Sequence, residues 1–173
     1  MLSRGSALAV CLAVALAPAL SATAQAHFVW ISTQTEGPKL AVSAGFGEPG
    51  DWDADNAGKI AHTQYFVRHA EGQETPVELT RDGETAAYRG ATESAHAVAV
   101  LGVCEYGVIQ RGMNPPARLR YFAKSLVGAP DSWALANGSS KLVLDVGAKL
   151  DGDSVVLTVF SEGKPAAGLA LSL

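Results

Sequence analysis

The sequence has little cysteine and no hydrophobic run long enough to cross a membrane. Its two cysteines are Cys11 and Cys104. Cys11 lies in a segment that we expect to be removed, which would leave a single thiol and no internal disulfide. The apolar run at residues 8–20 is shorter than the roughly 20 residues that a membrane helix needs, and Pro18 interrupts it. We therefore expect no direct membrane insertion of the mature chain.

A strong charge of either sign is also missing. Lys and Arg number 13 and Asp and Glu number 17, which gives a net charge of −4 at pH 7. Scattered basic residues in a mildly acidic chain give no electrostatic basis for binding nucleic acid. The sequence also lacks a Gly-x-Ser-x-Gly nucleophile motif. These observations predict a protein that is not an enzyme and does not bind nucleic acid.

The first 26 residues have the features of a secretory signal peptide. Arg4 supplies the positive charge near the start, residues 8–20 form a short apolar core, and Ala24-Gln25-Ala26 has the small-x-small pattern of a cleavage site. Cleavage after Ala26 would make His27 the first residue of a periplasmic or secreted protein.

Short strands separated by turn residues account for most of the remaining chain. About ten such strands predict an all-β fold, an antiparallel Ig-like β-sandwich. The apolar run at 97–103 predicts a strand that is covered on both faces, followed by a β-bulge around Glu105. Two segments, 57–61 and 132–136, are each compatible with one helical turn.

The predicted β-sandwich domain covers residues 27–150. Residues 151–173 are either the final strands of that domain or the truncated start of a second β-domain, and the sequence leaves both alternatives open.

His27 is the main candidate metal ligand. As an amino-terminal residue it would offer two nitrogens to one ion, the α-amino nitrogen and Nδ1 of the ring. A second imidazole would complete a three-nitrogen site of the histidine-brace type, which suits Cu(II) and Ni(II). The α-amino group has a pKa of about 7.7–8, so a bound metal must displace a proton at neutral pH.

The second imidazole must come from His62, His69 or His96. His62 is the preferred candidate because it ends an acidic loop directly before a predicted strand, where a side chain can project into a site. The acidic loop itself, Asp51-x-Asp53-x-Asp55, matches only the first ligand positions of an EF-hand. We therefore interpret it as a solvated loop. The metal site predicted from the sequence consists of His27 and His62.

Several motifs resemble an exported bacterial family of unknown function with an Ig-like β-sandwich, grouped with periplasmic components of nickel and cobalt uptake systems. The motifs that carry this resemblance are His27-Phe28-Val29-Trp30-Ile31, Phe46-Gly47-Glu48, Ile60-Ala61-His62-Thr63, Cys104-Glu105-Tyr106-Gly107-Val108, Tyr121-Phe122-Ala123-Lys124 and Gly163-Lys164-Pro165-Ala166-Ala167-Gly168. The resemblance implies export, handling of a divalent metal (Ni, Co or Cu) and a metal-uptake membrane complex as the partner. By motif, it places His27 and His62 at the metal.

Two other functions remain open at this point. The chain could be a structural or adhesion module in which His27 binds nothing. It could also be a copper histidine-brace redox enzyme, which would need an open metal face and an aromatic substrate surface. A measurement of metal binding through the amino terminus would distinguish the two metal-dependent functions, metal uptake and copper redox chemistry, from a structural or adhesion function.

Overall fold

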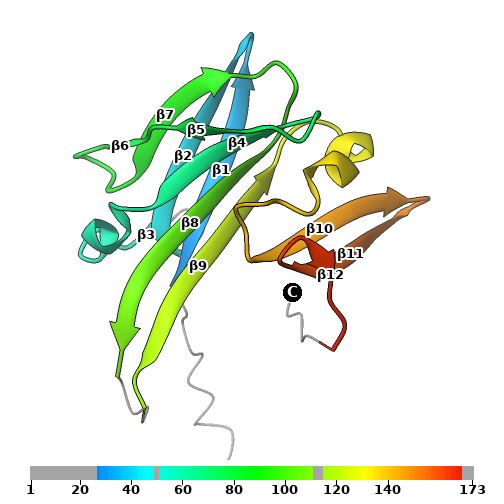
Figure 1. Cartoon of the computed structure of the whole chain (residues 1–173). Helices are drawn as coiled ribbons and strands as arrows, with labels where there is room; N and C mark the ends of the chain where they lie inside the picture. The colour runs from blue at the N-terminus through cyan, green and yellow to red at the C-terminus, as the bar shows by residue number, and fades with distance from the viewer. Residues whose placement is uncertain (1–26, 49–50, 111–114, 169–173) are drawn as a thin grey trace, which may run out of the picture.

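Two antiparallel sheets packed face to face form most of the molecule (Figure 1). The computed structural model describes residues 27–48, 51–110 and 115–168, so the predicted signal peptide lies outside the described residues. The first sheet has the order β1-β2-β7-β6, with β3 paired to β2. Its strands are β1 (Phe28–Glu36), β2 (Lys39–Glu48), β3 (Asp51–Trp52), β6 (Thr80–Arg81) and β7 (Tyr88–Glu93).

The second sheet has the order β5-β4-β8-β9. Its strands are β4 (Gln64–His69), β5 (Glu74–Val77), β8 (Ala97–Ile109) and β9 (Ala117–Leu126). All pairs in both sheets are antiparallel. The prediction of an all-β antiparallel sandwich is therefore confirmed.

Alternation of apolar and polar residues explains how the two sheets share a core. On β2 the buried side chains are Leu40, Val42, Ala44 and Phe46, which all face the second sheet because side chains two residues apart lie on one face. On β4, Tyr65 and Val67 face them from the opposite side. Burial of a side chain of this size contributes about 1.5–3 kcal/mol to stability.

The apolar strand β8 is covered on both faces, as the sequence predicted. Val100 and Cys104 belong to the cluster between the sheets, whereas Val98 and Leu101 pack with Leu142 in a second cluster on the other side. The predicted bulge around Glu105 is also present, because the register between β8 and β9 shifts between Cys104 and Gly107.

Both segments that were compatible with a helical turn form short 3₁₀ helices, η2 (Ala57–Ile60) and η3 (Pro130–Ala136). The Tyr88 hydroxyl donates a hydrogen bond to the Ala57 carbonyl at 3.0 Å, which fixes η2 to the first sheet. None of the helices in the described part of the chain is long and apolar enough to cross a membrane.

A third, smaller sheet follows the sandwich and lies beside it (Figure 1). Its strands are β10 (Leu144–Asp151), β11 (Ser154–Ser161) and β12 (Lys164–Pro165). The predicted boundary at 150/151 falls at the end of β10. This strand forms a hairpin with β11, in which Leu144 pairs with Ser161 and Asp151 pairs with Ser154. The strands on the two sides of that boundary therefore form one unit.

The third sheet is attached to the sandwich by polar contacts as well as by packing. Val146 and Val155 remain 40% and 50% exposed. In contrast, Asp145 is 3% exposed, and its carboxylate accepts a hydrogen bond from Lys124 of β9 at 2.8 Å. This ion pair links β10 directly to the second sheet.

Candidate functional site

His27 immediately precedes β1, at the edge of the first sheet. The register pairs Phe28 with Gly47, so His27 lies beside the end of β2. Its carbonyl oxygen accepts a hydrogen bond from the Tyr121 hydroxyl on β9 at 3.3 Å. These contacts attach the backbone of His27 to both sheets, while its side chain stays 44% exposed.

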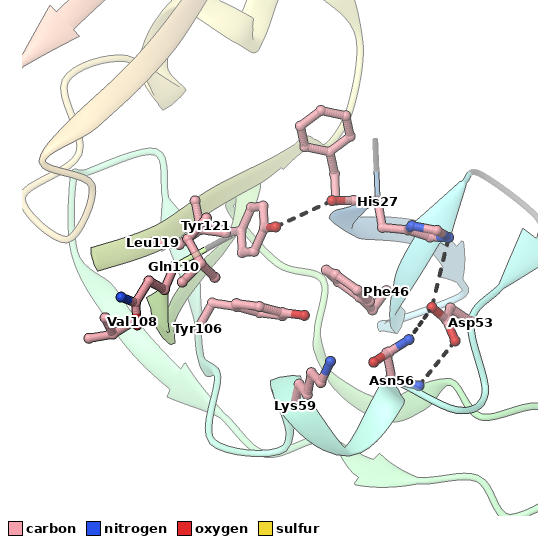
Figure 2. Close-up of a pocket in the computed structure, with 12 residues that line it drawn as sticks. His27, Phe46, Asp53, Asn56, Lys59, Tyr106, Val108, Gln110, Leu119 and Tyr121 are labelled. Carbon is pink, nitrogen blue, oxygen red and sulfur yellow. Dashed lines mark hydrogen bonds and ion pairs between the residues drawn. The ribbon is translucent and has the colours of Figure 1, made fainter. Parts of the chain in front are cut away.

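The partner that the structure brings to the His27 ring is Asp53. Strand β3 pairs antiparallel with the end of β2, and the Asp53 N–H donates to the Phe46 carbonyl at 2.7 Å. This pairing places Oδ2 of Asp53 at 3.8 Å from Nε2 of His27 (Figure 2). At this distance the two groups attract each other when the ring is protonated. Asp53 is only 17% exposed, so the loop residue is not simply solvated.

Asn56 holds the Asp53 carboxylate in place. The Asn56 backbone N–H donates to Oδ1 at 3.0 Å, and its side-chain amide donates to Oδ2 at 2.7 Å. The side-chain hydrogen bond from Asn56 is the main reason that the pKa of Asp53 lies below its ordinary value. Partial burial opposes this decrease, whereas the Asn56 backbone N–H and the positive charge that His27 can carry lower the pKa further. The carboxylate therefore stays ionised at neutral pH and faces the His27 ring with a negative charge.

Aromatic rings form the floor of a pocket that opens beside His27 (Figure 2). The Phe46 ring lies between the His27 ring, with centroids 5.7 Å apart, and the Tyr106 ring, with centroids 5.3 Å apart, and it is stacked on both. Tyr121 meets Phe46 and Tyr106 edge-on. The pocket has a volume of about 760 Å³, which is the size of a small-molecule site.

Lys59 supplies the positive charge of this pocket. It extends from η2, and its ammonium nitrogen lies 5.8 Å from the centroid of the Tyr106 ring (Figure 2). This distance is within the range of a cation–π contact. Within the described residues Lys59 forms no ion pair with a carboxylate.

His62 does not line this pocket. Its Nε2–H donates to the carbonyl of Glu105 at the β8 bulge. The other two candidate metal ligands also have partners outside this pocket. Nε2 of His69 forms a hydrogen bond with the Thr75 hydroxyl at 3.1 Å, and Nδ1 of His96 lies 3.4 Å from the Glu71 carboxylate. Among the described residues, no group of three or more His, Cys, Asp or Glu side chains is placed to share an ion.

Cys104 and Tyr121 are the other reactive side chains near this end of the sandwich. Cys104 is buried in the core, and burial raises the pKa of its thiol. Burial likewise raises the pKa of the Tyr121 hydroxyl, with a further increase from Tyr106. Both groups therefore stay protonated at neutral pH.

The sequence interpretation missed Asp53 because it treated the acidic loop as one solvated segment. The available signal was the closeness of Asp53 to Phe46-Gly47-Glu48 in the sequence, because β3 pairs back onto this end of β2, beside His27. That closeness alone did not identify Asp53 as the partner of His27.

Comparison of this chain with models of protein families, with curated proteins and with solved structures found no match. The family resemblance of the sequence motifs thus remains a prediction.

Proposed function

We propose that the mature protein is a periplasmic or secreted β-sandwich module that captures a divalent transition metal as cargo. Nickel, cobalt and copper all fit the nitrogen donors, and delivery to a metal-uptake complex in the membrane is the role that the motif resemblance implies. The α-amino nitrogen and Nδ1 of His27 would hold the ion after cleavage at Ala26. These two atoms form a chelate that a histidine inside a chain cannot offer.

The orientation of the His27 ring is the observation that carries this proposal. Nε2 is the nitrogen turned toward Asp53, which leaves Nδ1 as the nitrogen that shares the chelate with the α-amino group. Histidines that bind metals usually donate their second ring N–H to a carboxylate or carbonyl, which fixes the tautomer and makes the ligand more basic. Asp53, held by Asn56, has the charge for this role and lies 3.8 Å from Nε2.

We expect an Ala-Pro extension before His27 to abolish tight binding of Ni(II) and Cu(II). The extension turns the α-amino nitrogen of His27 into an amide and moves the free amino group two residues away, and the proline has no amide N–H through which a new chelate could form. Calorimetry of both forms measures the effect, and we expect the affinity to fall by at least about tenfold because one donor of the chelate is lost. Equal affinities for the two forms would rule out the amino-terminal site and favour a structural module.

Asp53→Asn tests the carboxylate separately. The asparagine keeps the shape, and its single amide oxygen can still accept one of the two hydrogen bonds from Asn56, but it loses the charge that faces Nε2. We expect the affinity for Ni(II) to decrease by about 10- to 100-fold, which is typical for removal of a carboxylate that orients a metal-binding histidine. The matched control is Asp51→Asn, an exposed carboxylate on β3, which we expect to leave the affinity unchanged. A decrease of the same size in both variants would indicate a general charge effect instead.

A further inference from the structure

The number of donors at His27 is smaller than the number that the ion needs. The α-amino nitrogen and Nδ1 supply two, whereas Cu(II) and Ni(II) take at least four ligands. His62, the residue predicted from the sequence to be the third, is engaged with the Glu105 carbonyl and is not in the pocket lining. The remaining positions are thus available to ligands from outside the protein.

The pocket beside His27 has the shape for a flat organic ligand. Phe46 is stacked on His27 and Tyr106 at interplanar angles of 24° and 25° and is only 4% exposed, so the half-buried rings of Tyr106 and Tyr121 supply the aromatic surface of the pocket. Tyr121 adds an edge at right angles to Tyr106. Aromatic ligands bind such surfaces through offset-stacked and edge-to-face contacts. A volume of about 760 Å³ is much larger than a single ion and its waters require.

The charge of the pocket selects the class of ligand. An aromatic pocket with a carboxylate suits an organic cation, but in this pocket the Lys59 ammonium group already occupies the position beside the rings. Lys59 lies over Tyr106, and Asp53 faces His27. A second cation next to Lys59 would be repelled, whereas a carboxylate would pair with its ammonium group. The pocket therefore favours a planar anion.

We propose that the protein takes its metal as a complex with a small planar heteroaromatic carboxylate. This inference rests on the proposed function, because the ion is the one held by His27. A ring nitrogen and one carboxylate oxygen of the ligand would complete the metal coordination, its ring would contact Tyr106 and Tyr121, and the carboxylate would face Lys59. The aromatic floor then serves to select the cargo.

Two chelators of matched chemistry test this proposal on the natively cleaved protein. Picolinate and glycinate both bind Ni(II) through one nitrogen and one carboxylate oxygen, but only picolinate has an aromatic ring. Calorimetry would compare the affinities of the two one-to-one nickel complexes for the protein. We expect the picolinate complex to bind about five- to tenfold more tightly, the gain that an aromatic contact typically gives. Equal affinities would overturn the proposal.

Variants of the pocket then assign the preference to its residues. We expect Tyr106→Leu to remove the difference between the two complexes and Tyr106→Phe to retain it, which distinguishes loss of the ring from a loss of folding. Lys59→Gln should weaken both complexes, whereas Lys39→Gln, an exposed lysine at the other end of β2, should weaken neither. A preference for picolinate that persists in Tyr106→Leu would also refute the pocket as its origin.

Nickel alone separates this inference from the proposed function. If free Ni(II) binds to the native amino terminus, and not to the Ala-Pro-extended form, while the chelator makes no difference, the proposed function stands and the chelator proposal fails. If neither free Ni(II) nor its picolinate complex binds, both fail.

Discussion

Lys124→Met is expected to lower the free energy of unfolding by about 3–5 kcal/mol, the usual cost of removing one partner of a buried ion pair. The Lys124 ammonium donates to the Asp145 carboxylate at 2.8 Å and to the Ala136 carbonyl at 2.9 Å. The two side chains are only 9% and 1% exposed. Without the lysine, the described residues leave the Asp145 carboxylate one hydrogen bond, a long one of 3.4 Å from the Ser139 N–H.

Urea unfolding of the wild type and the variant measures this loss. The double variant Lys124→Met with Asp145→Leu is the informative control, because it removes the stranded charge as well as its partner. We expect it to be more stable than Lys124→Met alone, since the main penalty of the single variant is the unpaired buried carboxylate. Lys39→Met, on the exposed end of β2, should change stability by less than about 0.5 kcal/mol. A single variant as stable as this control would contradict a structural role for the pair.

The sequence was sufficient to predict the sandwich because its core depends on local patterns. The alternation on β2 places Leu40, Val42 and Ala44 on one face, and the continuous run on β8 requires cover on both faces. The third sheet was harder to predict. Its attachment depends on Lys124 and Asp145, which lie in different sheets, and no local pattern indicates that two such residues pair.

The candidate site was predictable only in part, for the same reason. His27 follows from the cleavage pattern in the chain itself. The pairing of β3 with β2 brings Asp53 to His27, and the rings of Phe46 and Tyr106 stack across the two sheets. His62 was selected because loop ends often project into sites. Its direction is determined by the bulge on β8, which presents the Glu105 carbonyl to its ring.

Gly47→Ala should disturb the fold and the candidate site together. Gly47 has φ +132°, a conformation that other residues rarely adopt, and an added Cβ would lie 2.5 Å from the Asp51 carbonyl oxygen and 2.9 Å from the Asp53 nitrogen. Backbone strain and the clash each cost about 1–3 kcal/mol, so we expect a total loss of about 3 kcal/mol or more. The pairing of β3 with β2 positions Asp53 beside His27, so a shift of β3 would move Asp53 away from His27.

The matched control is Gly37→Ala, in the turn between β1 and β2. Gly37 also has a positive φ, +61°, but an added Cβ would meet no atom within 4 Å, so the substitution should cost only about 1 kcal/mol. Chemical unfolding of both variants measures the stability difference, and Ni(II) calorimetry of the folded protein measures the site. We expect Gly47→Ala to weaken Ni(II) binding as Asp53→Asn does, and Gly37→Ala to leave it unchanged. If Gly47→Ala loses stability but keeps the wild-type nickel affinity, the position of Asp53 does not matter to the metal, and the ring of His27 must be oriented by its stacking on Phe46 alone.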